Sequence, residues 1–193
     1  MAVYLNVKTR LRWAIPLAVV VVAVAAATAN DYVSARQKVD LIEGDRLKPG
    51  SRVELTPQEL NAYAAHEVPA GVRNPRLQVT APGLATGSAL VDFGKVRRAQ
   101  GHPPGWLMSM LLDGERPVSV TARIRSANGS ATVDVERVQI SGLQIDGGTL
   151  DFLIQNILLP MYPDAAVGRP FALGHRIEKL DVQPRAVGVV IGK

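Results

Sequence analysis

The stretch Pro117-Val118-Ser119-Val120-Thr121-Ala122-Arg123-Ile124-Arg125 has apolar residues at every even position and polar residues at the odd positions from Ser119 onward. This alternation is typical of a half-buried β-strand, because successive side chains of a strand point to opposite faces. Asn128-Gly129 follows, a dipeptide that tolerates the positive φ angles of a two-residue hairpin turn. The sequence therefore predicts a hairpin of two strands, 117–126 and 131–140, with Ile124 and Ala131 on the same buried face.

The second strand of this hairpin changes phase once. Its inward residues are odd-numbered at first (Ala131, Val133, Val135) and even-numbered later (Val138, Ile140). One additional residue in the strand produces such a shift, so we expect a β-bulge near Glu136-Arg137. Asp134 and Glu136 alternate with valines, and we interpret them as solvated outer-face residues and not as a catalytic acid and base.

Other segments extend this hairpin into a larger sheet. The positions of apolar residues predict further strands at 76–80, 84–96, 176–182 and 186–191. Thr56, Pro57 and Glu59 form a capping-box pattern that begins a helix ending near His66. Thr149 is expected to cap a second helix, 150–159, which ends before Pro160. The predicted fold class is α+β: a long, curved, mainly antiparallel sheet with two short covering helices, preceded by an N-terminal signal or anchor helix.

The N-terminus has the pattern of a targeting segment. Lys8, Arg10 and Arg12 precede an apolar run from Trp13 to Ala29, and the run ends in the small residues Ala27-Thr28-Ala29. This is the layout of a signal peptide, and the run is also at the short end of the roughly 17–25 residues that span a bilayer. A cleaved signal and a retained anchor both fit. Either one exports the following domain across the inner membrane, to be periplasmic or anchored by the N-terminal helix.

We accordingly expect three parts: a signal peptide or membrane anchor (1–29), a polar linker (30–50) and a single α+β domain (51–193). Three of the 22 basic residues lie in the first part and all 17 acidic residues lie beyond it, so the remainder has a net charge of about +2. A nucleic-acid-binding domain would need a more concentrated positive charge.

Composition and spacing also argue against catalysis. The chain has no cysteine, which excludes disulfides, thiol nucleophiles and cysteine metal sites. The three histidines, His66, His102 and His175, are far apart in the sequence, and there is neither a nucleophile elbow nor a phosphate-binding glycine loop. We therefore expect a protein that is not an enzyme, with no catalytic residue, no metal and no cofactor.

Two segments are more apolar than a single layer over a sheet requires. The first follows Pro103-Pro104-Gly105, and the second is the expected helix 150–159. Their candidate groove-lining residues are Trp106, Leu107, Met110, Leu111, Phe152, Leu153 and Ile157. Ordinary core packing is the alternative for both segments, and a lid or a membrane-dipping tip is a further alternative for the first.

The order of these elements resembles a known kind of protein. An anchor, the stretch Leu55-Thr56-x-x-Glu59-Leu60-Asn61, long strands, a late apolar helix and a terminal hairpin look like small envelope proteins of the DUF2140 and DUF2993 kind, which are associated with tubular lipid-binding (TULIP-like) architectures. The resemblance implies an elongated domain with a groove for acyl chains. The expected partner is then membrane lipid or another apolar ligand. The alternative is a membrane-tethered scaffold that docks an envelope protein partner through its edge strands.

Overall fold

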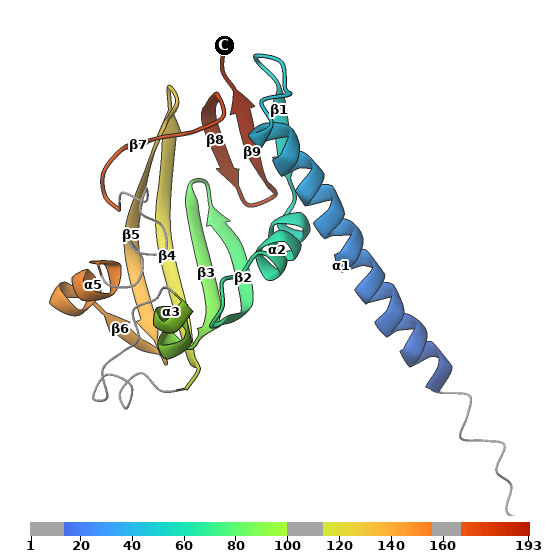
Figure 1. Ribbon diagram of the computed structural model, residues 1–193, viewed down its shortest axis with the longest axis vertical. Coiled ribbons are helices and arrows are strands. Elements are labelled where there is room, and N and C mark those ends of the chain that lie inside the picture. The colour runs from blue at the N-terminus through green and yellow to red at the C-terminus, as the bar shows by residue number, and fades with distance from the viewer. Residues whose placement is uncertain (1–13, 100–113, 156–166) are drawn as a thin grey trace, which may run out of the picture.

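The computed structural model describes residues 14–99, 114–155 and 167–193 (Figure 1). Its helices are α1 (Ala14–Glu43), α2 (Pro57–His66), α3 (Phe93–Ala99) and α5 (Gly147–Leu153). Its strands are β1 (Arg52–Leu55), β2 (Val72–Ala81), β3 (Leu84–Val91), β4 (Arg116–Ala127), β5 (Ser130–Ile140), β6 (Leu143–Ile145), β7 (Phe171–Ala172), β8 (Ile177–Gln183) and β9 (Ala186–Ile191). The predicted α+β class, with a long antiparallel sheet, is confirmed.

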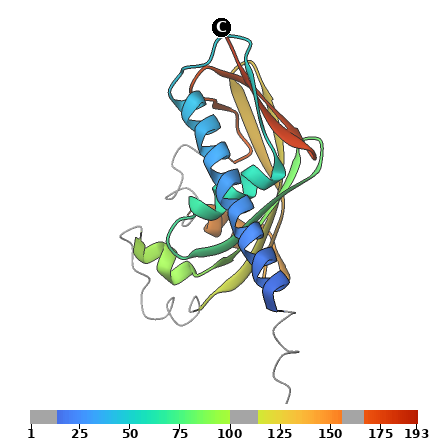
Figure 2. The ribbon, with the colours of Figure 1, turned by 90° about the vertical axis from the view of Figure 1, so that its right-hand side faces the viewer.

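The strands form two sheets. The large sheet has the order β2-β3-β4-β5-β6, with β7 paired to β5, and the small sheet has the order β1-β9-β8. Figure 2 shows the large sheet from its edge: its long strands are bowed, and α2 (teal) and α3 (light green) lie on the same side of it. The other face of the large sheet is free of described helices.

The hairpin predicted from the sequence is confirmed. Asn128 and Gly129 have φ angles of 51° and 73°, and β4 pairs with β5 on either side of them. Ser126 lies opposite Ala131, which places Ala131 on the face of Ile124. The bulge is also confirmed, because Thr121 pairs with Arg137 while Ala122 pairs with Val135, so Glu136 is the additional residue.

The outer face of this hairpin is charged, as the alternation predicts. Arg123 pairs with Glu136 at 2.6 Å, and Arg125 pairs with Asp134. These side chains are exposed or half-buried, so the pairs contribute little to stability. Asp134 and Glu136 are therefore surface partners of arginines.

The small sheet is fastened to the large one through the outer edge of β8. The Gly83 N–H donates to the Val182 carbonyl (2.8 Å), and the Gly129 N–H donates to the Glu178 carbonyl (2.9 Å). Between them, the Ser126 hydroxyl donates to the Leu180 carbonyl and accepts from the Leu180 N–H, both at 2.8 Å. Turn amides and one side chain thus take the place of a regular strand ladder.

Residues 30–43, which the sequence analysis assigned to a polar linker, are the second half of α1. Ala35 is fully buried and Ile42 is buried in the core beside the small sheet. Tyr32, Ala35, Val39 and Ile42 repeat at intervals of three and four residues, which places them on one helical face. The linker prediction was wrong because this narrow apolar stripe is surrounded by polar residues.

Two boundary predictions were also wrong. The strand predicted for 84–96 ends at Val91, because the Asp92 side chain accepts from the Lys95 N–H (2.8 Å) and begins α3. The second helix begins at Gly147, with Asp146 as its N-cap, so Thr149 lies inside the helix and does not cap it. Residues 156–159 of the predicted helix lie outside the described residues. The sequence analysis also missed β1, β6 and β7.

Most of the buried hydrophobic residues form two separate clusters, and Ala131, Val138 and Val182 are buried outside both. The first, which we call the junction core, joins α1, α2 and the small sheet around Ala35, Ile42, Leu55, Val189 and Ile191. The second lies under α3 and consists of Phe93 and Val96 packed against half-buried residues of β2, β3, β4 and β5. The two cores lie toward opposite ends of the large sheet (Figure 1).

Candidate functional site

An aliphatic strip crosses the helix-bearing face of the large sheet between the two cores. The strand register places Leu77, Val79, Ala85, Val120, Ala122, Ile124, Val133 and Val135 on this face. None of these residues is fully buried, and none belongs to either core cluster. We call this set the middle strip. Apolar residues that remain half-buried in a row are suited to contact an apolar partner.

The structure does not bring the seven predicted groove residues together within its described part. Trp106, Leu107, Met110, Leu111 and Ile157 lie outside the described residues. Phe152 and Leu153 fall in α5, which lies beside β6 at one side of the large sheet (Figure 1). The lining role of these residues therefore stays a prediction.

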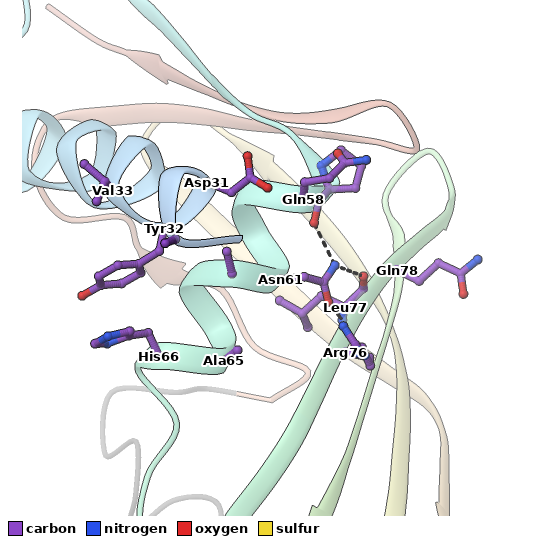
Figure 3. A pocket seen from close by; sticks show the side chains of 13 residues that line it. Asp31, Tyr32, Val33, Gln58, Asn61, Ala65, His66, Arg76, Leu77 and Gln78 are labelled. Atoms are coloured by element: carbon purple, nitrogen blue, oxygen red, sulfur yellow. Dashed lines mark hydrogen bonds between the residues drawn. The ribbon is translucent and has the colours of Figure 1, made fainter. Parts of the chain in front are cut away.

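A groove of about 950 Å³ lies between α1, α2 and β2, and its lining residues are shown in Figure 3. Val33 of α1 and Leu77 of β2 line it, and these large aliphatic side chains are 51% and 42% exposed. Tyr32 stacks on His66, with ring centroids 3.9 Å apart. Leu77 also belongs to the middle strip, so the two surfaces share this residue.

Glu59, at the start of α2, is the most densely bonded side chain near this groove. Its carboxylate accepts from Lys38 Nζ (2.6 and 2.8 Å), from the Ser34 hydroxyl and from the Thr56 N–H (2.8 Å). Its side chain is 7% exposed. Burial alone would raise the pKa of Glu59, but the hydrogen bonds from Lys38, Ser34 and Thr56 outweigh it and lower the pKa to about 2. The charged pair therefore fastens α1 to α2.

Asn61, two residues further along α2, covers the free edge of β2. Its side-chain amide donates to the Leu77 carbonyl (2.9 Å), and its side-chain oxygen accepts from the Leu77 N–H (2.8 Å). The predicted capping box is confirmed as well, because Thr56 Oγ1 accepts from the Glu59 N–H (3.2 Å). The stretch 55–61, which carried the resemblance, thus has a structural role at every polar position that the resemblance specified.

The described residues contain no group of three or more His, Asp or Glu side chains that could hold a metal ion. His66 stacks on Tyr32, His175 lies in the turn before β8, and His102 lies outside the described residues. Among the residues whose side chains the structure describes, which in α1 begin at Ala29, no helix is long and apolar enough to cross a membrane.

The chain matches no protein-family model, and no characterised protein or solved structure matches it. The resemblance to the DUF2140 and DUF2993 kind therefore stays a prediction. The middle strip and the groove beside α1 are the two surfaces from which a function can be inferred.

Proposed function

We propose that this protein is an extracytoplasmic, membrane-associated binding protein of the bacterial envelope that holds the acyl chain of a lipid, or a similar apolar ligand, against the middle strip. The observation that carries the proposal is the position of the strip. Its aliphatic residues lie between two cores and belong to neither. The apolar run Trp13–Ala29 supports a location at the membrane. The proposal includes no reaction.

The energetics favour an aliphatic ligand. Burying a methylene group is worth about 0.8 kcal/mol, so a chain that buries ten of them gains about 8 kcal/mol before the entropic cost of binding. The inward residues of the strip are valine, alanine, leucine and isoleucine, which offer no hydrogen bonds to a polar ligand. An acyl chain needs none.

The scaffold alternative requires a free strand edge, and three described edges carry hydrogen bonds that a partner strand would have to displace. Asn61 bonds both backbone groups of Leu77 on β2. Turn amides and Ser126 bond the edge of β8. Lys38 Nζ donates to the Glu54 carbonyl of β1 (2.8 Å). Among these four described edges, strand addition would be least hindered at β6, where Leu143 is 71% exposed.

Lipid co-purification tests the proposal. The full chain is purified in mild detergent, and bound lipid is extracted and quantified by mass spectrometry. We expect Val120→Asp, on the strip, to lose most of the bound lipid, because a carboxylate would be placed against the acyl chain. Ser119→Asp is the matched control, since it places the same charge on the opposite face of the same strand.

A second variant guards against simple unfolding. Val120→Trp adds bulk without charge, and we expect it to reduce bound lipid by occupying the strip. Circular dichroism establishes that each variant is folded. Equal lipid content in folded Val120→Trp, Val120→Asp and the original chain would contradict the proposal.

A further inference from the structure

We propose that the groove between α1, α2 and β2 receives one phospholipid directly from the bilayer that holds the apolar run Trp13–Ala29. This inference rests on the proposed function and adds the source of the lipid and the place where it is first held. The groove is built from residues that the sequence analysis assigned to the end of the signal or anchor segment, a linker, a capped helix and a strand.

The position of the groove along α1 is the first argument. Ala29, the last residue of the apolar run, lines the groove together with Asp31, Tyr32 and Val33. A helix rises 1.5 Å per residue, so Val33 is about 6 Å beyond Ala29 along the axis. The helix is continuous from Ala14 to Glu43. The wall of the groove therefore begins where the apolar run ends, at the level of the lipid headgroups.

The attachment of α1 is the second argument. Glu59 binds Ser34 and Lys38, which lie on the turns after the groove wall. Ala35 and Ile42 of the same helix are buried in the junction core. These contacts keep the groove at a fixed distance from Ala29 along the axis of α1. A flexible linker, as expected from the sequence, would have let the domain move away from the bilayer.

The chemistry of the walls is the third argument. Val33 and Leu77 leave aliphatic surface exposed, and Tyr32 has the amphipathic ring that suits a membrane interface. Arg76 supplies a guanidinium, whose geometry suits a phosphate. Figure 3 shows Asp31 and Arg76 at different ends of the groove, so the carboxylate does not occupy the place proposed for the phosphate. Mainly apolar walls, with polar side chains and one arginine among them, suit an amphipathic phospholipid.

A partner strand is a poorer occupant. Asn61 already bonds the Leu77 N–H and carbonyl, so a strand could not pair with β2 at that position. Leu77 also lies in the middle strip, which places the groove next to the surface proposed for the acyl chain.

The experiment changes the distance between the bilayer and the groove, and Ala29 is the one groove-lining residue that it displaces. The full chain is reconstituted into vesicles of phosphatidylglycerol and phosphatidylcholine that contain a phospholipid with a photoactivatable diazirine in one acyl chain. A variant carries twelve Gly/Ser residues between Ala29 and Asn30, a flexible segment with an end-to-end distance of about 20 Å. A control carries the same twelve residues after Lys193.

We expect the original chain and the C-terminal control to cross-link to the phospholipid at groove residues, and the insertion variant to lose at least tenfold in yield. Val33→Asp should lower the cross-linking yield by a similar factor. Gln37→Asp should leave the yield unchanged, because Gln37 is exposed one turn further along α1 and does not line the groove. A dimer of the original chain in detergent that the Val33→Asp variant does not form would assign the groove to a second copy and overturn the inference.

A parallel measurement separates the two proposals. Binding of a fluorescent fatty acid, added from water to the detergent-solubilised chains, reports the proposed function alone. Retained binding by the insertion variant, together with loss of its cross-linking, supports direct uptake from the bilayer. Equal cross-linking of the insertion variant and the original chain overturns the inference and leaves the proposed function standing. If the original chain neither binds the fatty acid nor cross-links to the phospholipid, both proposals are contradicted.

Discussion

The junction core and the middle strip use the same aliphatic residue types but differ in how they are enclosed. In the junction core, Ile191 is 1% exposed and Ala35 is 0% exposed, and the Glu59–Lys38 pair lies beside them. In the middle strip, Ile124 and Val120 point to the helix-bearing face and remain half-buried. Composition alone therefore does not separate an enclosed core from a half-buried aliphatic surface, whereas tertiary packing does.

Ile191→Ala and Ile124→Ala compare directly how much the junction core and the middle strip contribute to stability. We expect Ile191→Ala to lower the free energy of unfolding by about 4 kcal/mol, because it leaves a cavity in an enclosed core. Ile124→Ala should cost about 1.5 kcal/mol, because part of its side chain is already exposed. Urea unfolding followed by circular dichroism measures both. Equal losses would show that the middle strip is an enclosed core, which would remove the basis of the proposed function.

A series of unfolding measurements at acid pH tests how much the Glu59–Lys38 ion pair stabilises the fold. The pKa of Glu59 is lowered from 4.5 to about 2 in the folded protein. A lowered pKa stabilises the fold above pH 4.5, and this contribution is lost as the pH falls toward 2. The shift corresponds to about 3 kcal/mol. We expect urea midpoints to fall over this window in the original chain and to fall less in Glu59→Gln. Parallel pH profiles for the two chains would contradict the assignment.

Local patterns predicted much of the sheet from the sequence. Alternation and Asn128-Gly129 determine the β4–β5 hairpin because all its signals lie within adjacent residues. The small sheet was missed as a separate unit because it joins Arg52 to Val190, and no local pattern reports a pairing over that separation. The second half of α1 did have a signal, the spacing of Tyr32, Ala35, Val39 and Ile42, which its polar surroundings concealed.

The candidate site was less predictable than the fold. Alternation places aliphatic residues on one face of the sheet, but whether other elements cover them depends on tertiary packing. The groove beside α1 arises where three elements meet, and the Asn61–Leu77 contact joins a helix to a strand. The seven residues chosen from apolar composition lie mainly outside the described residues, so their role in a groove stays a prediction.

Asn61→Ala tests the protection of the β2 edge. Asn61 makes two hydrogen bonds to Leu77 and one to the Pro57 carbonyl (2.8 Å), so we expect a loss of about 2 kcal/mol. The exposed edge should also promote self-association, visible as concentration-dependent sedimentation. Gln58→Ala, on the same helix and lining the same groove, should change stability by less than about 0.5 kcal/mol. A monomeric Asn61→Ala chain of unchanged stability would contradict the role given to Asn61.

Thr56→Ala has the smallest expected effect and separates the cap of α2 from the ion pair. The substitution removes the acceptor for the Glu59 N–H but leaves the bond from the Thr56 N–H to Glu59, so the expected loss is about 1 kcal/mol. Thr56→Ser keeps the hydroxyl and should restore most of it. Because the two bonds of a capping box are reciprocal, Thr56→Ala and Glu59→Gln should not be additive, and the double variant should differ from the sum by at least about 0.5 kcal/mol. Additive losses, measured by urea unfolding of all four chains, would mean that the cap holds α2 independently of the contact that fastens it to α1.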